Sequence, residues 1–208
     1  MAELTRVAFL ALLALVGIQR LAELRVSRRN RRRLLARGAR LAPDPSYRWM
    51  VALHAAVLGG AGAEVWFLRR PFLPALAVAM GILFLAANAL RWWVIRTLGD
   101  RWNVEVLDAR GMPPVTAGPY RFIRHPNYTA VFVEMVALPL LHTAWLTALL
   151  GGLAHLAVLR ARVRAEDAVL LADPGYRSLL GATPRFFPRI LPAAGAGKEA
   201  PTAAGEGK

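Results

Sequence analysis

The feature that most constrains this chain is a series of apolar runs, each close to the length that crosses a lipid bilayer. Of its 208 residues, 56% are hydrophobic, and five such runs follow one another. They extend approximately over Leu4–Leu24, Trp49–Leu68, Phe72–Val94, Tyr128–Leu141 and Ala144–Leu159. A helix of roughly 20 apolar residues spans a membrane. We therefore predict an all-α integral membrane protein with about five transmembrane helices.

The last two runs are the shortest, near the lower limit of about 17 residues for a spanning helix. Pro139 and His142-Thr143 stand where the first of them ends and the second begins. We interpret the pair as a helical hairpin. A full crossing and a re-entrant pair that turns back inside the bilayer both fit this pattern.

The net charge of +14 is unevenly distributed, because a cluster of arginines follows directly after the first apolar run. The cluster consists of Arg25, Arg28, Arg29, Arg31, Arg32, Arg33, Arg37 and Arg40. Basic residues mark the cytoplasmic end of a membrane segment and attract anionic lipid head groups, so we expect membrane lipid and not nucleic acid as the partner. We predict a cytoplasmic loop over Arg25–Arg40 and an N-terminus outside. The Arg- and Ala-rich composition indicates a bacterial plasma membrane.

The basic cluster follows the first run, whereas a secretory signal peptide carries its basic residues first, so we interpret this run as a retained helix. The chain has no cysteine, which excludes disulfides, a thiolate nucleophile and thiolate metal ligands, and we predict no metal site. His54 and Glu64 stand inside the second run, where ionisable groups raise the question of a functional role. We interpret both as partners in interhelical hydrogen bonds.

The stretch Met112–Tyr128 differs from everything around it, because it is polar and rich in proline. Such a stretch beside membrane-length helices lies either in water or against a cavity enclosed by protein. Gly118-Pro119 and His125-Pro126 each restrict the backbone, since proline fixes its own φ and limits the residue before it. A solvated loop and the stiff frame of a binding pocket are the two interpretations. The stiffness favours the pocket.

Arg162 and Glu166 are four residues apart, so they share one face of the helix that continues the last apolar run. A surface ion pair is the simpler interpretation and is worth only about 0.3–0.5 kcal/mol. Alternatively, the carboxylate and the guanidinium contact different parts of a ligand. The residues alone favour the surface pair.

The sequence resembles the isoprenylcysteine carboxyl methyltransferase (ICMT) family from about Leu98 to Pro188. The resemblance rests on Gly-Pro-Tyr-Arg-Phe-Ile-Arg-His-Pro-Asn-Tyr at 118–128, the apolar hairpin, Arg162 followed by Glu166-Asp167 and Leu170, and Tyr176. The front half is similar to bacterial members through Arg20-Leu21-Ala22-Glu23-Leu24 and Ser27-Arg28-Arg29-Asn30. Some of those members methylate alkylpyrone or polyketide hydroxyls. Two departures are Asp167, where the family usually has a second Glu, and the stiff pair Pro113-Pro114.

The resemblance implies a membrane methyltransferase that binds S-adenosylmethionine (SAM) at its cytoplasmic face. The implied cofactor-binding residues are Met112, Pro113, Pro114, Val115, Tyr120, His125, Pro126, Asn127, Tyr128 and Glu166. The implied catalytic residues are Arg162, beside the acceptor, and His125. We divide the chain into N-terminal transmembrane helices with the Arg-rich loop (1–96), a methyltransferase core (97–190) and a disordered tail (191–208).

The resemblance leads us to expect O-methylation of a lipophilic or lipidated acceptor, either an isoprenylcysteine-type carboxylate or a polyketide enol. An acceptor that is already ionised needs no base, whereas a poorly acidic hydroxyl would need His125 or Glu105. Methylation of phospholipid amines or small thiols is the alternative within enzymes, and an acceptor site with Arg162 disfavours the amines. A membrane scaffold or a transporter is the alternative outside enzymes, although the repeated broken helices of a transporter are not seen in the sequence.

Overall fold

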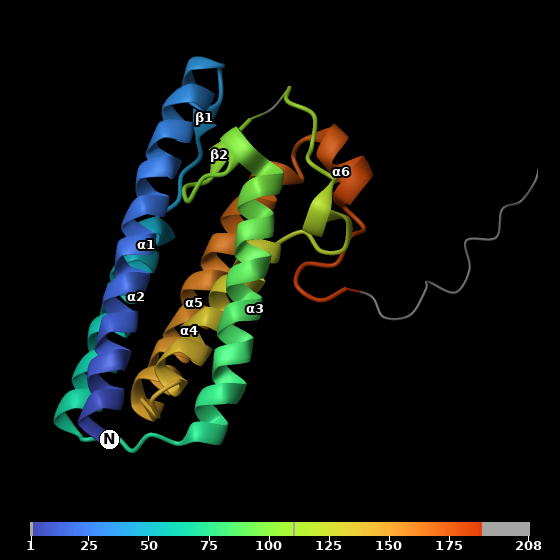
Figure 1. The fold of residues 1–208 in the computed structure, drawn as a ribbon. Helices are drawn as coiled ribbons and strands as arrows, with labels where there is room; N and C mark the ends of the chain where they lie inside the picture. The colour runs from blue at the N-terminus through green and yellow to red at the C-terminus, as the bar shows by residue number, and fades with distance from the viewer. Residues whose placement is uncertain (1, 110, 189–208) are drawn as a thin grey trace, which may run out of the picture.

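A computed structural model describes residues 2–109 and 111–188 and shows a bundle of long helices with a small irregular cap at one end (Figure 1). The helices are α1 (Ala2–Ala36), α2 (Ser46–Phe67), α3 (Pro74–Leu98), α4 (Pro126–Leu140), α5 (Trp145–Leu170) and α6 (Pro174–Leu180). Two single turns, η1 (Gly99–Arg101) and η2 (Gly118–Arg121), and two strands, β1 (Arg40–Leu41) and β2 (Leu107–Asp108), complete the cap. The predicted tail, 191–208, lies outside the described residues.

Four helices are long and apolar enough to cross a membrane: α1, α2, α3 together with η1, and α5. The predicted all-α membrane architecture is therefore confirmed. The predicted count of five is approximate, because α4 has 15 residues and is about 22 Å long, whereas the hydrocarbon layer is about 30 Å thick. In Figure 1, α4 lies in the middle of the bundle, and it packs mainly against α3 and α5 and to a smaller extent against α2.

Proline fixes where several helices begin. Pro74, Pro126 and Pro174 stand in the first turns of α3, α4 and α6, where the missing N–H would have no partner anyway. Asp173 caps α6 by accepting a hydrogen bond from the Tyr176 amide at 2.9 Å. Gly118 has φ +58°, and a Cβ there would collide with the Thr97 side chain on α3. The polar stretch is thus held against the bundle at Gly118 and where α4 begins.

The arginine-rich segment is helical as far as Ala36, so the predicted loop over Arg25–Arg40 is wrong for most of its length. Helix α1 continues because its inner face carries two small polar residues that bind the connection after α3. The Ser27 hydroxyl contacts Asn103 at 3.0 Å, and the Asn30 amide donates to the Trp102 carbonyl at 2.8 Å. Both side chains are 1% exposed, which makes this contact part of the core.

The largest apolar core lies where α1, α2, α3 and α4 meet, toward the end opposite the cap. Glu64 joins α2 to the start of α5 there. Its carboxylate accepts hydrogen bonds from the Leu146 and Thr147 amides at 3.1 and 2.7 Å and pairs with Arg70 at 2.8 Å. The predicted interhelical role of Glu64 is confirmed. His54 differs, because its Nδ1 bonds the Met50 carbonyl of its own helix at 2.7 Å.

We expect Glu64→Ala to lower the free energy of unfolding by about 2 kcal/mol, at the upper end for a lost helix cap, because two amides of α5 lose their acceptor. Thermal unfolding in detergent measures the change. The matched control is Glu3→Ala, an exposed acid in the first turn of α1, with an expected effect below about 0.5 kcal/mol. Equal stability of the two variants would contradict the capping role.

Candidate functional site

A cavity of about 560 Å³ lies between the long helices and the cap, and both halves of the chain line it. All of the residues predicted as site residues are found on its wall: Met112, Pro113, Pro114, Val115, Tyr120, His125, Pro126, Asn127, Tyr128, Arg162 and Glu166. Residues of α1 and α2, such as Leu24 and His54, line it as well. The stretch Met112–Tyr128 is therefore the frame of a pocket, whereas the division of the chain at 96/97 stays a prediction.

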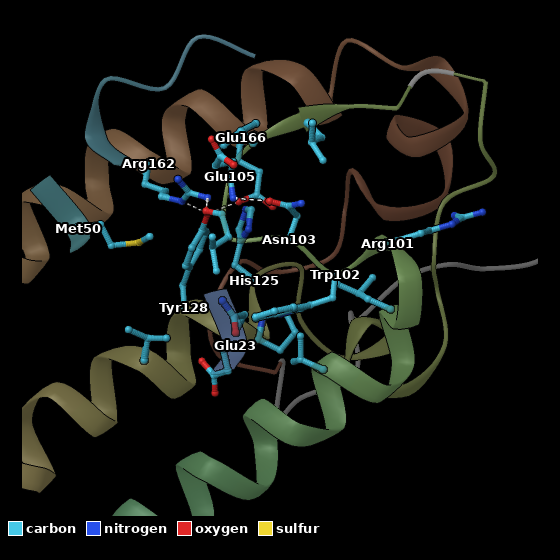
Figure 2. Close-up of a pocket in the computed structure, with 18 of the residues that line it drawn as sticks. Glu23, Met50, Arg101, Trp102, Asn103, Glu105, His125, Tyr128, Arg162 and Glu166 are labelled. Carbon is cyan, nitrogen blue, oxygen red and sulfur yellow. Dashed lines mark hydrogen bonds between the residues drawn. The ribbon is translucent and has the colours of Figure 1, made fainter. Parts of the chain in front are cut away.

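Arg162 and Glu166 each form a hydrogen bond with the hydroxyl of Tyr128 and do not pair with each other (Figure 2). The Tyr128 hydroxyl donates to Glu166 Oε2 and accepts from Arg162 Nε, the latter at 2.8 Å. Arg162 is 3% exposed. The surface ion pair considered from the sequence is therefore wrong, because both residues face the cavity and α4 places a tyrosine between them.

The guanidinium of Arg162 is held by two more groups from distant parts of the chain. Its Nη1 pairs with Asp44 Oδ2, and its Nη2 donates to the Val104 carbonyl. Asp44 precedes α2, and the antiparallel pair β1–β2 ties the segment before it to the segment that contains Val104. Because each of its three nitrogens bonds a different group, the guanidinium of Arg162 is held in one orientation on the cavity wall.

His125 is oriented by Asp167 on the neighbouring helix. His125 Nε2 lies 2.9 Å from Asp167 Oδ1, and the same carboxylate contacts Arg185 Nε at 2.8 Å and Arg124 Nη1 at 3.4 Å. The amides of Arg124 and His125 also donate to the carbonyls of Pro184 and Arg185. Glu166 lines the cavity, whereas Asp167 supports its wall from behind. Asp167, which stands where the family usually has a longer Glu, therefore holds His125 and the two arginines in place from behind the wall.

We expect Asp167→Asn to cost about 3–5 kcal/mol of stability, because a buried carboxylate that serves three cationic or polar partners is lost. Arg185→Ala is the graded comparison. Its side chain is 54% exposed, so its removal should cost about 1 kcal/mol or less. Thermal unfolding of both variants in detergent checks the order. A larger loss in Arg185→Ala would contradict the bracing role of Asp167.

Tyr120 and Tyr176 also line the cavity, and their chemistry is limited by burial. Burial, reinforced by the charge of Glu166, raises the pKa of the Tyr120 phenol well above its usual value. The same two causes, with burial again the larger, raise the pKa of Tyr176 to about 12. Both phenols stay protonated near neutral pH, so they can donate hydrogen bonds to a ligand but do not act as bases.

A group of four buried charges lies between α1, α3 and α4, and three of its members line the cavity. Glu23 pairs with Arg91 at 2.5 Å and with Arg20 at 2.7 Å, and Arg20 also pairs with Glu134 at 2.7 Å. Figure 2 shows Glu23 on the far side of His125 from Glu166. Arg20 and Glu23 belong to the segment that is similar to bacterial family members, and in the structure Arg91 is a further partner of Glu23.

The cavity wall is polar toward the cap and mostly apolar within the helix bundle, where the charged group of Arg20, Glu23 and Arg91 also reaches it. Tyr120, Glu166 and Tyr176 lie toward the cap, whereas Leu21 and Leu58 line the part within the helix bundle. Several polar atoms of residues on the wall have no hydrogen-bond partner among the described residues, and the Asn127 Oδ1 and the Arg124 Nε are two of them. These orphaned atoms, together with the Glu166 carboxylate, offer a polar ligand an acceptor, a donor and a charge.

Three residues on or behind the cavity wall lack a recognisable signal in the sequence. They are Trp102, which is 2% exposed, Asp44, which binds Arg162, and His155, which faces the cavity from α5. Asp44 stands between two prolines and looks like a turn residue. Trp102 follows an interfacial stretch in which tryptophan is expected to contact lipid. Only the packing of α1 against the connection after α3 shows that Trp102 is buried.

Comparison with known proteins gives the family. The model of the isoprenylcysteine carboxyl methyltransferase (ICMT) family matches residues 78–172. The chain is 32% identical over 163 residues to the uncharacterized protein YpbQ of Bacillus subtilis, an alignment that covers 78% of this chain and 96% of that relative. The chain belongs to the ICMT family. An uncharacterized protein of Haemophilus influenzae is 26% identical over 148 residues, which cover 71% of this chain and 86% of the relative.

A solved structure shows the same fold. The eukaryotic intramembrane Ras methyltransferase ICMT superposes with a TM-score of 0.51 at 21% identity, over 63% of this chain and 48% of that one. The chain thus matches about half the length of that protein. With the family match and the four membrane-length helices, the protein is an integral membrane methyltransferase of bacterial type.

Proposed function

We propose that the protein transfers a methyl group from SAM to an ionised oxygen of a lipophilic acceptor. The observation that carries this proposal is the continuity of one cavity, which joins a polar end around Glu166 to a mostly apolar part within the helix bundle, with Arg162 on its wall. A water-soluble donor and a membrane-soluble acceptor can meet in such a cavity. The four membrane-length helices and the family match support the same conclusion.

The residues at the polar end fit the donor. We propose that the Glu166 carboxylate holds its ammonium group and that the unpartnered Arg124 Nε holds its carboxylate. The unpartnered Asn127 Oδ1 can accept a hydrogen bond from an amine of the base. Met112 to Val115 and Pro126 supply apolar and carbonyl surface, although one of these carbonyls, that of Pro113, already accepts from Arg101. When bound, SAM supplies an electrophilic methyl group on a positively charged sulfur.

Arg162 is proposed to position the acceptor. Its charge and its fixed guanidinium favour a carboxylate or an enolate, whose oxygen lone pair forms the new C–O bond as the S–C bond breaks. Opposite charges cancel in this step, so a buried site that excludes water favours the transition state. An ionised acceptor needs no base. His125, held by Asp167, is then a residue that shapes the donor pocket rather than a proton acceptor.

An ionised oxygen fits this site better than the amine of an aminophospholipid. A protonated amine would meet the Arg162 cation, which repels it. We also propose the orientation that the charge distribution predicts, with the cap, the arginine-rich end of α1 and the cavity opening on the cytoplasmic side of a bacterial plasma membrane.

The test of the function uses radiolabelled SAM. Membranes that contain the wild-type protein are incubated with the donor, and the lipid extract is separated and counted beside that of membranes from cells carrying an empty vector. The expected result is a labelled product that is absent from the control. It is either a methyl ester, which base cleaves, or a methyl enol ether, which acid cleaves. Label that appears only on phospholipid head groups or small thiols would contradict O-methylation.

A further inference from the structure

The part of the cavity within the helix bundle contains an imidazole without a hydrogen-bond partner. His155 lies on α5, is 2% exposed and lines the cavity. Among the described residues, neither its Nδ1 nor its Nε2 has a hydrogen-bond partner. A buried polar group is normally paired, because leaving it unpaired carries a desolvation cost. Two unpaired nitrogens on one cavity wall therefore point to a ligand that pairs with them.

A second histidine lies beside His155 and faces the same cavity. The ring of His54 on α2 meets that of His155 edge-on, with centroids 5.9 Å apart, and Phe132 on α4 stacks on His155 at 6.2 Å. His54 Nδ1 bonds the Met50 carbonyl, so its neutral ring keeps Nε2 as an acceptor. The two imidazoles together offer donors and acceptors, and they are fixed in place by three helices.

The spacing along α5 relates this pair to the proposed site of methyl transfer. His155 and Arg162 are seven residues apart, so they lie on the same face of the helix, about 10 Å apart along its axis. Both line the cavity, and the wall near them includes the apolar side chains of Leu58, Val131 and Val158. An acceptor whose reacting oxygen lies at Arg162 and whose chain runs toward the apolar end passes His155.

We propose that His155 and His54 form a second polar contact for the acceptor, which binds a neutral oxygen, a carbonyl or a hydroxyl, carried about 10 Å from the reacting oxygen. The proposal rests on the proposed function. It specifies the substrate class further, because the acceptor is then an oxygenated lipid chain and not a plain hydrocarbon chain. A carbonyl oxygen pairs with an imidazole N–H, whereas a hydrocarbon chain leaves both nitrogens of His155 unpaired.

Binding of two labelled probes tests this contact: stearic acid, and stearic acid with a ketone near the middle of the chain. Each is titrated into the full-length protein in detergent. The wild type should bind the keto acid about tenfold more tightly, as expected for one added hydrogen bond in a buried site. His155→Phe should bind the two acids equally, and His155→Gln should recover part of the preference. His142→Phe is the control, because His142 is equally buried but does not line the cavity.

The outcomes separate this proposal from the proposed function, because SAM binding is measured on the same samples. Equal binding of both acids by the wild type, or a preference that persists in His155→Phe, overturns the second contact and assigns the two nitrogens to bound water. Intact SAM binding in those samples leaves the methyltransferase assignment unaffected. A keto-acid preference in a protein that binds no SAM supports the contact and refutes the assigned donor.

Discussion

Arg162→Lys is expected to reduce the rate of methyl transfer by about 100-fold or more while the affinity for SAM changes little. Lysine keeps the charge but loses the planar fork that contacts Tyr128, Asp44 and the Val104 carbonyl at once. The acceptor oxygen would then be held in many orientations, and a displacement that needs an in-line approach is sensitive to that loss. Initial rates with saturating donor, together with equilibrium binding of the donor, separate the two effects.

The matched control is Arg164→Lys, on an exposed position of the same helix, which should leave both quantities unchanged. The folded fraction of each variant is compared by thermal unfolding, because Arg162 is buried and its contacts also stabilise the fold. A variant Arg162→Lys that is folded and transfers methyl at the wild-type rate would contradict the positioning role.

Glu166→Gln is expected to weaken SAM binding by about 10- to 100-fold, which corresponds to the loss of one charge-assisted hydrogen bond of about 1.5–3 kcal/mol. Glutamine has the same shape and can still accept from the Tyr128 hydroxyl, so the change isolates the negative charge. Titration calorimetry in detergent gives the affinity directly.

Asp100→Asn is the control for this variant. Asp100 lies in η1 on the cap, its side chain is 48% exposed, and it pairs with Arg33 outside the cavity. We expect its donor affinity to equal that of the wild type. A similar loss in Asp100→Asn would indicate a general electrostatic effect of the cap, and an unchanged affinity in Glu166→Gln would remove the carboxylate from the donor site.

The helices could be predicted from the sequence because membrane insertion depends on the apolar length of each single segment. Apolar length alone predicts α1, α2, α3 and α5, and prolines mark where α3 and α4 begin. The same local rule fails at the end of α1, where polarity predicts a loop. Ser27 and Asn30 keep that segment helical by binding a connection more than 70 residues away, which a local pattern does not contain.

For the candidate site, too, some residues could be predicted from local sequence and others depend on packing. The stiff stretch Met112–Tyr128 can be found from its prolines, and the family resemblance adds Arg162 and Glu166. The contact of Asp44 with Arg162 spans 118 positions and depends on how the short pair β1–β2 closes the cap. His155 stands in an apolar run where its ring looks like any core histidine. Only packing shows that it lines a cavity and that its nitrogens have no partner among the described residues.

The central claim is that this cavity binds SAM, and the most direct measurement is its equilibrium titration into the purified wild-type protein in nanodiscs. We expect saturable binding of one donor per chain, which S-adenosylhomocysteine competes away and which His125→Ala and Glu166→Ala each abolish. A folded wild-type protein that binds no SAM would show that this cavity is not a donor site.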